Sequence, residues 1–319
     1  MFAHLRRMLQ SQIMTCQEPE PGPEPDVGHS VRPGALYVVA TPIGHRGDLS
    51  PHACAVLGAV DRIAAEDTRT TGALLSHFGL RTPLVALHDH NEDRIAADLV
   101  RALQAGASLA LVADAGTPLI SDPGFALVRA ARAGNVPVYA VPGPCAAIAA
   151  LSISGIPTDT FVFAGFLPPR QAARRARLGE YLREPRTVVL YESSHRIGET
   201  LQDVVDVLGP QRQICLAREI SKRFEESTTA AAGEVLAWHR AEPNRSRGEF
   251  VVVLAGAPPQ DDSGEGERVL RLLLAELPAS GAARLAAAIT GAPRKALYAA
   301  AVRLADAHRQ IGENEPPPE

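Results

Sequence analysis

Three short apolar segments in the first half of this chain each run directly into a loop of glycine, proline and small polar residues. The segments are Ala35–Thr41, Leu109–Ala113 and Val136–Val141, and helix-forming sequence follows each one. Strict alternation of strands and helices predicts a parallel sheet, which places the region in the α/β class. In such a sheet all three loops lie at the carboxyl edge, where ligands bind at a topological switch point.

The rest of the first half continues the alternation. Strands are expected near Arg62–Ala65 and at Leu84–Leu87. Helices are expected to begin at Ser50-Pro51, Asn91 and Asp122-Pro123, where a capping residue opens each helix. After a break at Ser154–Pro157, a second α/β unit is predicted, with helices near 171–183, 195–208 and 233–241 and strands at Thr160–Ala164, Thr187–Tyr191, Gln213–Ala217 and Glu249–Leu254.

Composition suggests how these units are divided into domains. Residues 1–33 are rich in Pro and Glu and have little to bury, which predicts a disordered tail. Residues 34–154 and 155–257 form the two α/β domains, and residues 258–267 (PPQDDSGEGE) have the composition of a linker. Residues 268–308 predict three short helices with a turn at Gly291–Pro293, a helix-turn-helix-like tail, and residues 309–319 are expected to be disordered.

Charge and composition limit the classes of function. The formal net charge is -4 with a pI near 6.2, which argues against a protein that coats nucleic acid by charge alone. Four scattered cysteines without a CxxC pair fit a reducing cytoplasm and no structural zinc. No apolar run of about twenty residues is present, so we expect no membrane span. There is no GxxxxGK[ST] and no GxGxxG after the first strand, which disfavours a P-loop and a standard dinucleotide fold.

The three loops are the first candidates for a ligand site. Glycine lets the backbone approach a ligand closely, and proline keeps a loop rigid. Asp114, at the end of a strand, could accept hydrogen bonds from a ribose hydroxyl or an amine. Any one of these loops could be an ordinary turn, but three together favour a small-molecule site. The predicted binding residues are Pro42, Gly44, Asp114, Gly116, Thr117, Pro142, Gly143 and Pro144.

Several segments resemble, in order, the motifs of the tetrapyrrole methylase superfamily and, more closely, those of its ribosomal RNA branch. They include YVVATPIGHRGDLS, AAEDTRTTGALLSHFG, LVADAGTPLISDPG and VPGPCAAIAALSISGIPTDTFVFAGFLP, and the match extends from about Gly34 to Gly256. One departure is visible, because the first loop carries the large residues His45 and Arg46 after Gly44.

The resemblance implies both a fold and an activity. The fold would be two α/β domains with a cofactor cleft between them and a small helical tail. The activity would be methyl transfer from S-adenosylmethionine, without a metal, to the ribose 2′-hydroxyl of one cytidine in the decoding region of 16S rRNA. The partner would be 16S rRNA within the small ribosomal subunit, and we also expect a cytoplasmic homodimer that does not bind a membrane.

Other charged residues are weaker candidates. Glu66 and Lys222 are possible catalytic groups, Lys222 as a base if burial lowers its pKa. Arg69 could orient a nucleotide and His88 and His90 could contact substrate, although a turn and a helix-entry loop explain the same residues. His88-Asp89-His90 has no cysteine partner, so we expect no metal there. Arg174, Arg175 and Arg177 form a basic segment that is either an RNA contact or a solvated helix face.

Two other functions stay open from the sequence. A related methyltransferase that acts on a tetrapyrrole or diphthine would share the cofactor loops but lack the helical tail and the arginines. A non-enzymatic RNA-binding module would need neither the loop at Asp114 nor the loop at Pro142.

Overall fold

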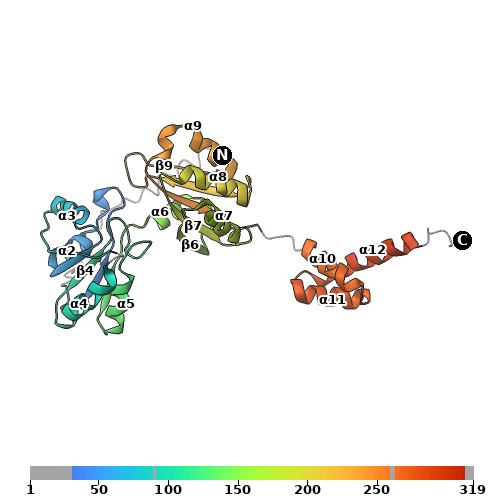
Figure 1. Ribbon diagram of the computed structural model, residues 1–319, viewed down its shortest axis with the longest axis horizontal. Helices are drawn as coiled ribbons and strands as arrows, with labels where there is room; N and C mark the ends of the chain where they lie inside the picture. The colour runs from blue at the N-terminus through green and yellow to red at the C-terminus, as the bar shows by residue number, and fades with distance from the viewer. Residues whose placement is uncertain (1–30, 89–90, 259–262, 313–319) are drawn as a thin grey trace, which may run out of the picture. The chain divides into compact units, whose positions relative to one another are not determined.

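The computed structural model describes residues 31–88, 91–258 and 263–312, except the side chains at 263–264 and 305–312. The chain divides into two compact units, one up to Gly256 and the other from Ala257 (Figure 1). The first unit contains two five-stranded sheets. Most of the two tails expected to be disordered lies outside the described residues, but Arg32 is ordered, since its Nη1 donates to the Tyr139 hydroxyl at 2.9 Å.

The first sheet is parallel throughout, as predicted. Its strand order is β3-β2-β4-β1-β5, so the three strands that end in glycine and proline loops are neighbours. The strands are β1 (Leu36–Val39), β2 (Arg62–Ala65), β3 (Leu84–Ala86), β4 (Leu109–Val112) and β5 (Val138–Val141).

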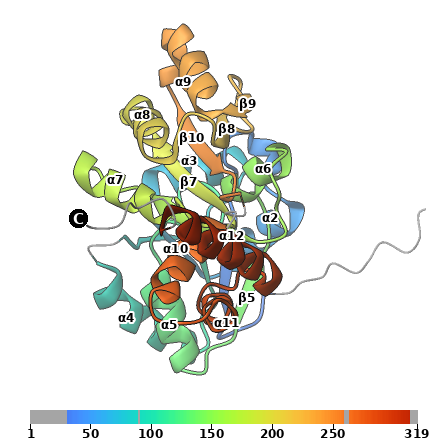
Figure 2. The same ribbon diagram turned by 90° about the vertical axis from the view of Figure 1, so that its right-hand side faces the viewer.

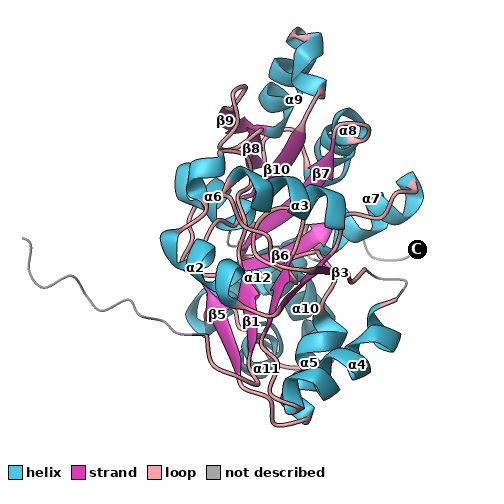
Figure 3. Ribbon diagram, turned by 90° about the vertical axis from the view of Figure 1, so that its left-hand side faces the viewer, coloured by secondary structure: helices cyan, strands magenta, loops and turns pink. Residues whose placement is uncertain are grey.

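Helices cover both faces of this sheet (Figure 3). Leu57 of α2 (Pro51–Ala59) and Leu75 of α3 (Thr68–His77) are buried in one core. Leu99 of α4 (Glu92–Gln104) and Leu127 of α5 (Phe125–Ala133) are buried in another, on the opposite face. The chain therefore leaves β1 toward one face and leaves its neighbour β4 toward the other, which makes the β1–β4 boundary a topological switch point.

The helix starts agree with the sequence prediction only in part. Ser50 caps α2, because its Oγ accepts a hydrogen bond from the Ala53 amide at 3.0 Å. Helix α5 begins at Phe125 and not at Pro123, because the backbone stays irregular as far as Gly124, which has a φ of 119°. The Gly124 amide instead donates to Glu92 Oε2 on α4 at 2.6 Å.

The second sheet is mixed, with the order β6-β7-β10-β8-β9. Only β6 and β7 pair in parallel, and the other pairs are antiparallel. Strand β9 was not predicted, because its sequence ESTTAA carries no large apolar residue. The strands are β6 (Phe161–Phe166), β7 (Thr187–Ser193), β8 (Gln213–Arg218), β9 (Glu226–Ala231) and β10 (Glu249–Leu254).

Different helices cover the two faces of the second sheet. Helices α7 (Gln171–Glu180), α8 (Ile197–Leu208) and α9 (Ala232–Ala241) pack on one face (Figure 2). Helix α6 (Ala146–Ile153), which directly follows the last strand of the first sheet, packs on the other face through Ala147 and Leu151. Helix α6 therefore joins the two halves of the first unit.

The basic segment on α7 differs from a surface patch at Arg174 only, since Arg175 and Arg177 keep part of their side chains exposed. The Arg174 side chain is fully buried, and its Nε donates to the equally buried Asp203 of α8 at 2.7 Å. Arg175 pairs with Asp206 at 3.0 Å, and Arg177 pairs with Glu180 on its own helix. Each of these three positive charges therefore has a carboxylate partner, from α8 for Arg174 and Arg175 and from α7 itself for Arg177.

The second unit is a small helical bundle. Leu270, Ala283, Ala286 and Leu297 form its buried centre. Helix α10 begins inside the segment predicted to be a linker, because small residues there allow close packing: a Cβ at Gly266 would lie 3.0 Å from Leu297 Cδ2. The helices are α10 (Ser263–Leu274), α11 (Ala279–Thr290) and α12 (Arg294–Gly312). Within the described residues, none of the helices is long and apolar enough to cross a membrane.

Loss of Arg174 should destabilise the first unit strongly. Arg174→Ala leaves Asp203 charged and buried without its main partner, which should lower the free energy of unfolding by about 3–5 kcal/mol. Arg177→Ala is the matched control and should change it by less than about 1 kcal/mol, because its ion pair is exposed. Urea denaturation measures the free energy of unfolding of both variants. Equal losses would contradict a stabilising role for the buried pair of Arg174 and Asp203.

Candidate functional site

The three glycine and proline loops meet at the carboxyl edge of the first sheet, as the sequence predicted. Thr41 and Gly116 exchange two backbone hydrogen bonds, of 2.9 and 3.1 Å, between the loops after β1 and β4. Thr117 Oγ1 donates to the Pro144 carbonyl at 3.0 Å, which ties in the loop after β5. A Cβ at Gly143 would lie 2.9 Å from Ala40 Cβ, so this loop passes too close to β1 for a side chain.

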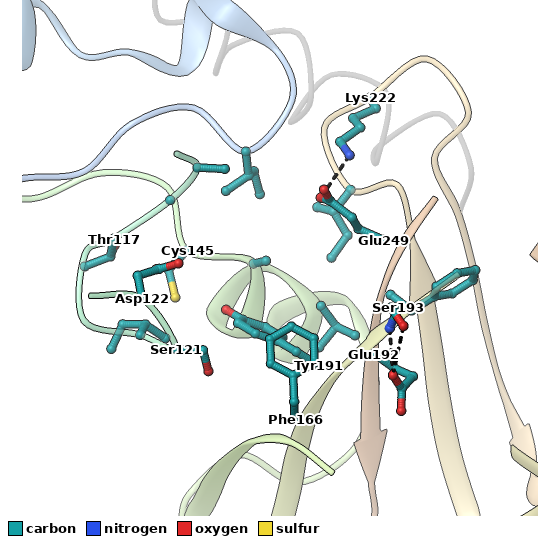
Figure 4. Close-up of a pocket in the computed structure, with 18 residues that line it drawn as sticks. Thr117, Ser121, Asp122, Cys145, Phe166, Tyr191, Glu192, Ser193, Lys222 and Glu249 are labelled. Carbon is teal, nitrogen blue, oxygen red and sulfur yellow. Dashed lines mark hydrogen bonds and ion pairs between the residues drawn. The ribbon is translucent and has the colours of Figure 1, made fainter. Parts of the chain in front are cut away.

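A cavity of about 240 Å³ lies between these loops and the second sheet (Figure 4). The first half lines it with Ile43, the segment Ala115–Thr117 and the segment Ile120–Asp122, and α6 contributes its first turn. The second half contributes the opposite wall, from the ends of β6, β7 and β10 and the loop after β8. The cleft is therefore built from both halves of the first unit.

The predicted binding residues take different places around this cavity. Gly116 and Thr117 line it directly. Pro42, Gly44, Pro142, Gly143 and Pro144 belong to the same loops but lie outside the lining. Asp114 is exposed at the end of β4, and its Oδ1 accepts a hydrogen bond from the Asp67 amide at 3.0 Å, which joins it to the loop after β2.

The loop after β1 reaches across to the second half of the unit. A Cβ at Gly44 would lie 2.5 Å from Lys222 Cγ and 2.8 Å from the Ser221 carbonyl oxygen, so only glycine fits. Ser221 Oγ hydrogen-bonds Asp48 Oδ2 and accepts from the His45 amide at 3.2 Å. The unusual His45 takes a local role here, since its Nδ1 accepts from the Gly47 amide at 3.1 Å and caps the short 3-10 helix Arg46–Asp48.

Lys222 lines the cavity as a cation. Its Nζ donates to Glu219 Oε1 at 2.9 Å. It also donates to Glu249 Oε2 at 3.0 Å (Figure 4). Burial lowers the pKa of Lys222, but the two carboxylates outweigh burial, and the pKa is raised above its ordinary value of 10.5. A lysine that keeps its proton cannot act as a base near neutral pH, which argues against the base role considered from the sequence.

The other charged candidates lie away from the cavity lining. Glu66 is half-buried at the end of β2. Arg69 pairs with Asp67 through Nε at 3.1 Å and Nη2 at 2.7 Å, and these bonds lower the pKa of Asp67 to about 2. The His88 amide donates to Asn91 Oδ1 at 2.9 Å, which fixes the entry to α4. His90 lies outside the described residues.

Sequence reasoning missed the aromatic wall of the cleft. Tyr191 and Phe166 line it from the second sheet, with ring centroids 5.7 Å apart and planes at 64°. The Tyr191 hydroxyl accepts from the Ala147 amide at 3.2 Å, at the first turn of α6. Burial, and then the neighbouring Cys145, raises the pKa of Tyr191 well above its ordinary value, so this hydroxyl stays protonated.

Backbone strain is concentrated around the cleft. Among the described residues other than glycine, positive φ occurs at Asn135 and at two residues on each side of the cavity. Leu119 and Ser121 lie in the loop after β4, and Glu219 and Ser221 lie in the loop after β8. Such conformations cost about 1–3 kcal/mol each and cluster at functional sites. Nothing in the sequence indicated positive φ at these four residues of the cleft, because none of the four is glycine or asparagine.

Comparison with known proteins agrees with this architecture. A family model described as Tetrapyrrole (Corrin/Porphyrin) Methylases matches residues 35–236. The chain is 53% identical over 268 residues to ribosomal RNA small subunit methyltransferase I of Xylella fastidiosa (strain Temecula1 / ATCC 700964), covering 83% of this chain and 98% of the relative. The chain belongs to the tetrapyrrole methylase family, in its ribosomal RNA small subunit methyltransferase I branch.

Further relatives extend this comparison. The Escherichia coli O157:H7 protein of the same name is 50% identical over 267 residues, covering 83% of this chain and 93% of the relative. A model described as the RsmI C-terminal HTH domain matches residues 260–305, the helical unit. A solved cobalt precorrin-4 methyltransferase has a TM-score of 0.51 at 13% identity, covering 70% of this chain and 95% of that one, and it shares the fold.

Substitutions at Lys222 can show whether this residue acts as a charged positioning group or as a base. Because its pKa is raised, the ion pairs of Lys222 stabilise the fold fully below about pH 10.5 and are lost only as the pH rises through the folded-state pKa. We expect Lys222→Arg to keep the shape of the pH–rate profile of methyl transfer between about pH 6.5 and 9.5. Lys222→Met, which removes the charge, should lower the rate at least about ten-fold. A profile that loses its rising limb in Lys222→Arg would identify Lys222 as the base.

Proposed function

We propose that the protein transfers a methyl group from S-adenosylmethionine to 16S rRNA of the small ribosomal subunit, at the ribose 2′-hydroxyl of a cytidine in the decoding region. The observation that carries the proposal is the cleft at the switch point, where three glycine and proline loops face a second sheet. The names of the relatives support ribosomal RNA as the substrate class.

The cleft fits the cofactor because its floor is backbone that approaches closely. Gly116 has a φ of 85° and lines the cavity, and a Cβ there would lie 3.3 Å from Ile43 Cγ2. Asp114, at the rim, offers a carboxylate to a ribose hydroxyl or an amine. The bound cofactor would supply an electrophilic methyl group on a sulfonium.

The chain's own contribution to the reaction is mainly positioning. Holding two reactants in line can supply about 7–11 kcal/mol of a barrier. The loops tied through Thr41 and Thr117 would hold the cofactor, and the wall with Phe166 and Tyr191 would face the incoming RNA. Lys222, still protonated, would contact a phosphate. Glu66 stays a candidate for accepting the proton of the attacking hydroxyl, and the exposed Arg69 stays a candidate for contacting RNA.

The direct test is methyl transfer from labelled S-adenosylmethionine to purified small subunits, to free 16S rRNA and to a porphyrinoid. We expect label in the ribosomal substrates alone. A methyl on the 2′-oxygen makes the next phosphodiester bond resist alkali, since cleavage needs a free 2′-hydroxyl. Digestion with alkali should therefore leave one labelled dinucleotide that begins with cytidine. Label in the porphyrinoid, or in mononucleotides after alkali, would contradict the proposal.

Removing the helical unit should separate cofactor binding from activity. The chain divides at Gly256, and the described part of the second unit has its own core at Leu270 and Leu297. A protein ending at Ala257 should stay folded and bind S-adenosylmethionine with unchanged affinity in calorimetry, but methylate small subunits at least about ten-fold more slowly. The exposed Arg294 and Lys295, at the start of α12, are the residues we expect to contact phosphate.

Two results would contradict this role for the helical unit. Full activity after truncation would show that the unit is dispensable. Loss of cofactor binding or aggregation would show that it only stabilises the protein. Light scattering of both proteins would also measure the proposed homodimer and show whether the helical unit is needed for it.

A further inference from the structure

Strand β6 contains an irregularity that changes the direction of its last side chain. Phe163 pairs with Val189 of β7, but the register then shifts, and Gly165 pairs with Leu190 and Phe166 with Tyr191. Without this shift, alternation would place Phe163 and Phe166 on opposite faces of the sheet. The extra residue instead places Phe166 on the same face as Phe163, the face that carries Tyr191 and borders the cleft.

The irregularity lies close to the first half of the unit and needs a glycine. Gly165 has a φ of 62°, and a Cβ there would lie 3.0 Å from Ser121 Oγ, in the strained loop after β4. Bulges beside active sites commonly redirect a side chain. The left-handed backbone at position 165 therefore favours glycine, and the bulge it allows sets the direction of Phe166.

Phe166 is also exposed, although it lines the cavity. About half of the residue, 53%, is open to solvent. One edge packs against Tyr191, which is fixed by the Ala147 amide and by Phe163 at a ring distance of 5.0 Å. Figure 4 shows the Phe166 ring beside Tyr191, across the cavity from Thr117 and Cys145. An aromatic ring that packs on one neighbour and is otherwise exposed in a cleft has a surface that a planar partner can cover.

We propose that Phe166 is a stacking platform for the base of the nucleotide that is methylated. This inference rests on the proposed function and adds a specificity-determining residue to it. A nucleotide that leaves its own base stack to enter a cleft loses stacking energy, and an aromatic side chain there can replace it.

The position of the ring favours the substrate base over the adenine of the cofactor. The predicted cofactor loops all lie on the first half, whereas Phe166 stands on the opposite wall at the end of β6. Its exposed half is accessible to a ligand that arrives from solvent.

The experiment compares Phe166→Ala with Phe166→Tyr, Phe166→Trp and Phe166→Leu. We expect Phe166→Ala to lower kcat/KM for the ribosomal substrate at least about 5-fold, the lower end of the cost of losing one stacked base. Calorimetric affinity for S-adenosylmethionine should change less than about 2-fold. Tyrosine and tryptophan should restore the rate to within about 3-fold of the native protein, and leucine should not. Phe161→Ala, at the other end of β6, is the matched control and should change neither kcat/KM nor the affinity for S-adenosylmethionine.

A binding measurement tests whether Phe166 stacks on the target base, even if the native protein does not methylate the RNA used. A short RNA of the decoding region, with a fluorescent cytidine analogue at the target position, should lose fluorescence on binding to the native protein and not on binding to Phe166→Ala. Unchanged kcat/KM and unchanged quenching in Phe166→Ala would overturn the proposal. If Phe166→Ala lost cofactor affinity as much as kcat/KM, the ring would instead contact the adenine of the cofactor. If Phe166→Leu kept the native kcat/KM, the contact would be apolar packing and not stacking. Failure of the native protein to methylate, with quenching intact, would contradict the proposed function alone.

Discussion

The pair of backbone hydrogen bonds between Thr41 and Gly116 is the constraint on which the site depends. It joins two loops whose chains leave neighbouring strands toward opposite faces of the first sheet. Once these loops are joined, Ile43 and Thr117 must border the same space, and Gly44 must pass against Lys222 of the second half. Helix α6 completes the arrangement, because it continues from the first sheet and packs under the second.

The sequence predicted the first sheet well because its three neighbouring strands β1, β4 and β5 run into loops where glycine or proline makes continuation unfavourable. Leu36–Val39 and Leu109–Val112 are buried on both faces, and such strands appear as continuous apolar runs. The edge strand Glu226–Ala231 has no such run, so only pairing with β8 defines it. The linker prediction failed at α10 because polar composition does not exclude a helix when Gly266 can pack against Leu297.

The site was predictable where it depends on backbone and not where it depends on tertiary partners. Gly116 and Thr117 line the cavity, as loop composition led us to expect, and their contact with the cofactor stays a prediction. Arg174 was misjudged as a possible surface group because its partner, Asp203, lies on the next helix and 29 positions away. Phe166 could not be found, because strand alternation places it on the wrong face unless the register shift is known.

The contact of Ser221 with the 45–48 loop is one of the connections between the two halves of the first unit. It consists of two hydrogen bonds, to Asp48 and from the His45 amide, and both are exposed to solvent. Bonds of this kind contribute roughly 1 kcal/mol each, so their loss leaves an open population on the order of a few per cent at room temperature. Loop movements of this size occur within about nanoseconds to microseconds. These two hydrogen bonds alone would therefore break and re-form many times within one second, so they are too weak to keep the two loops joined on that timescale.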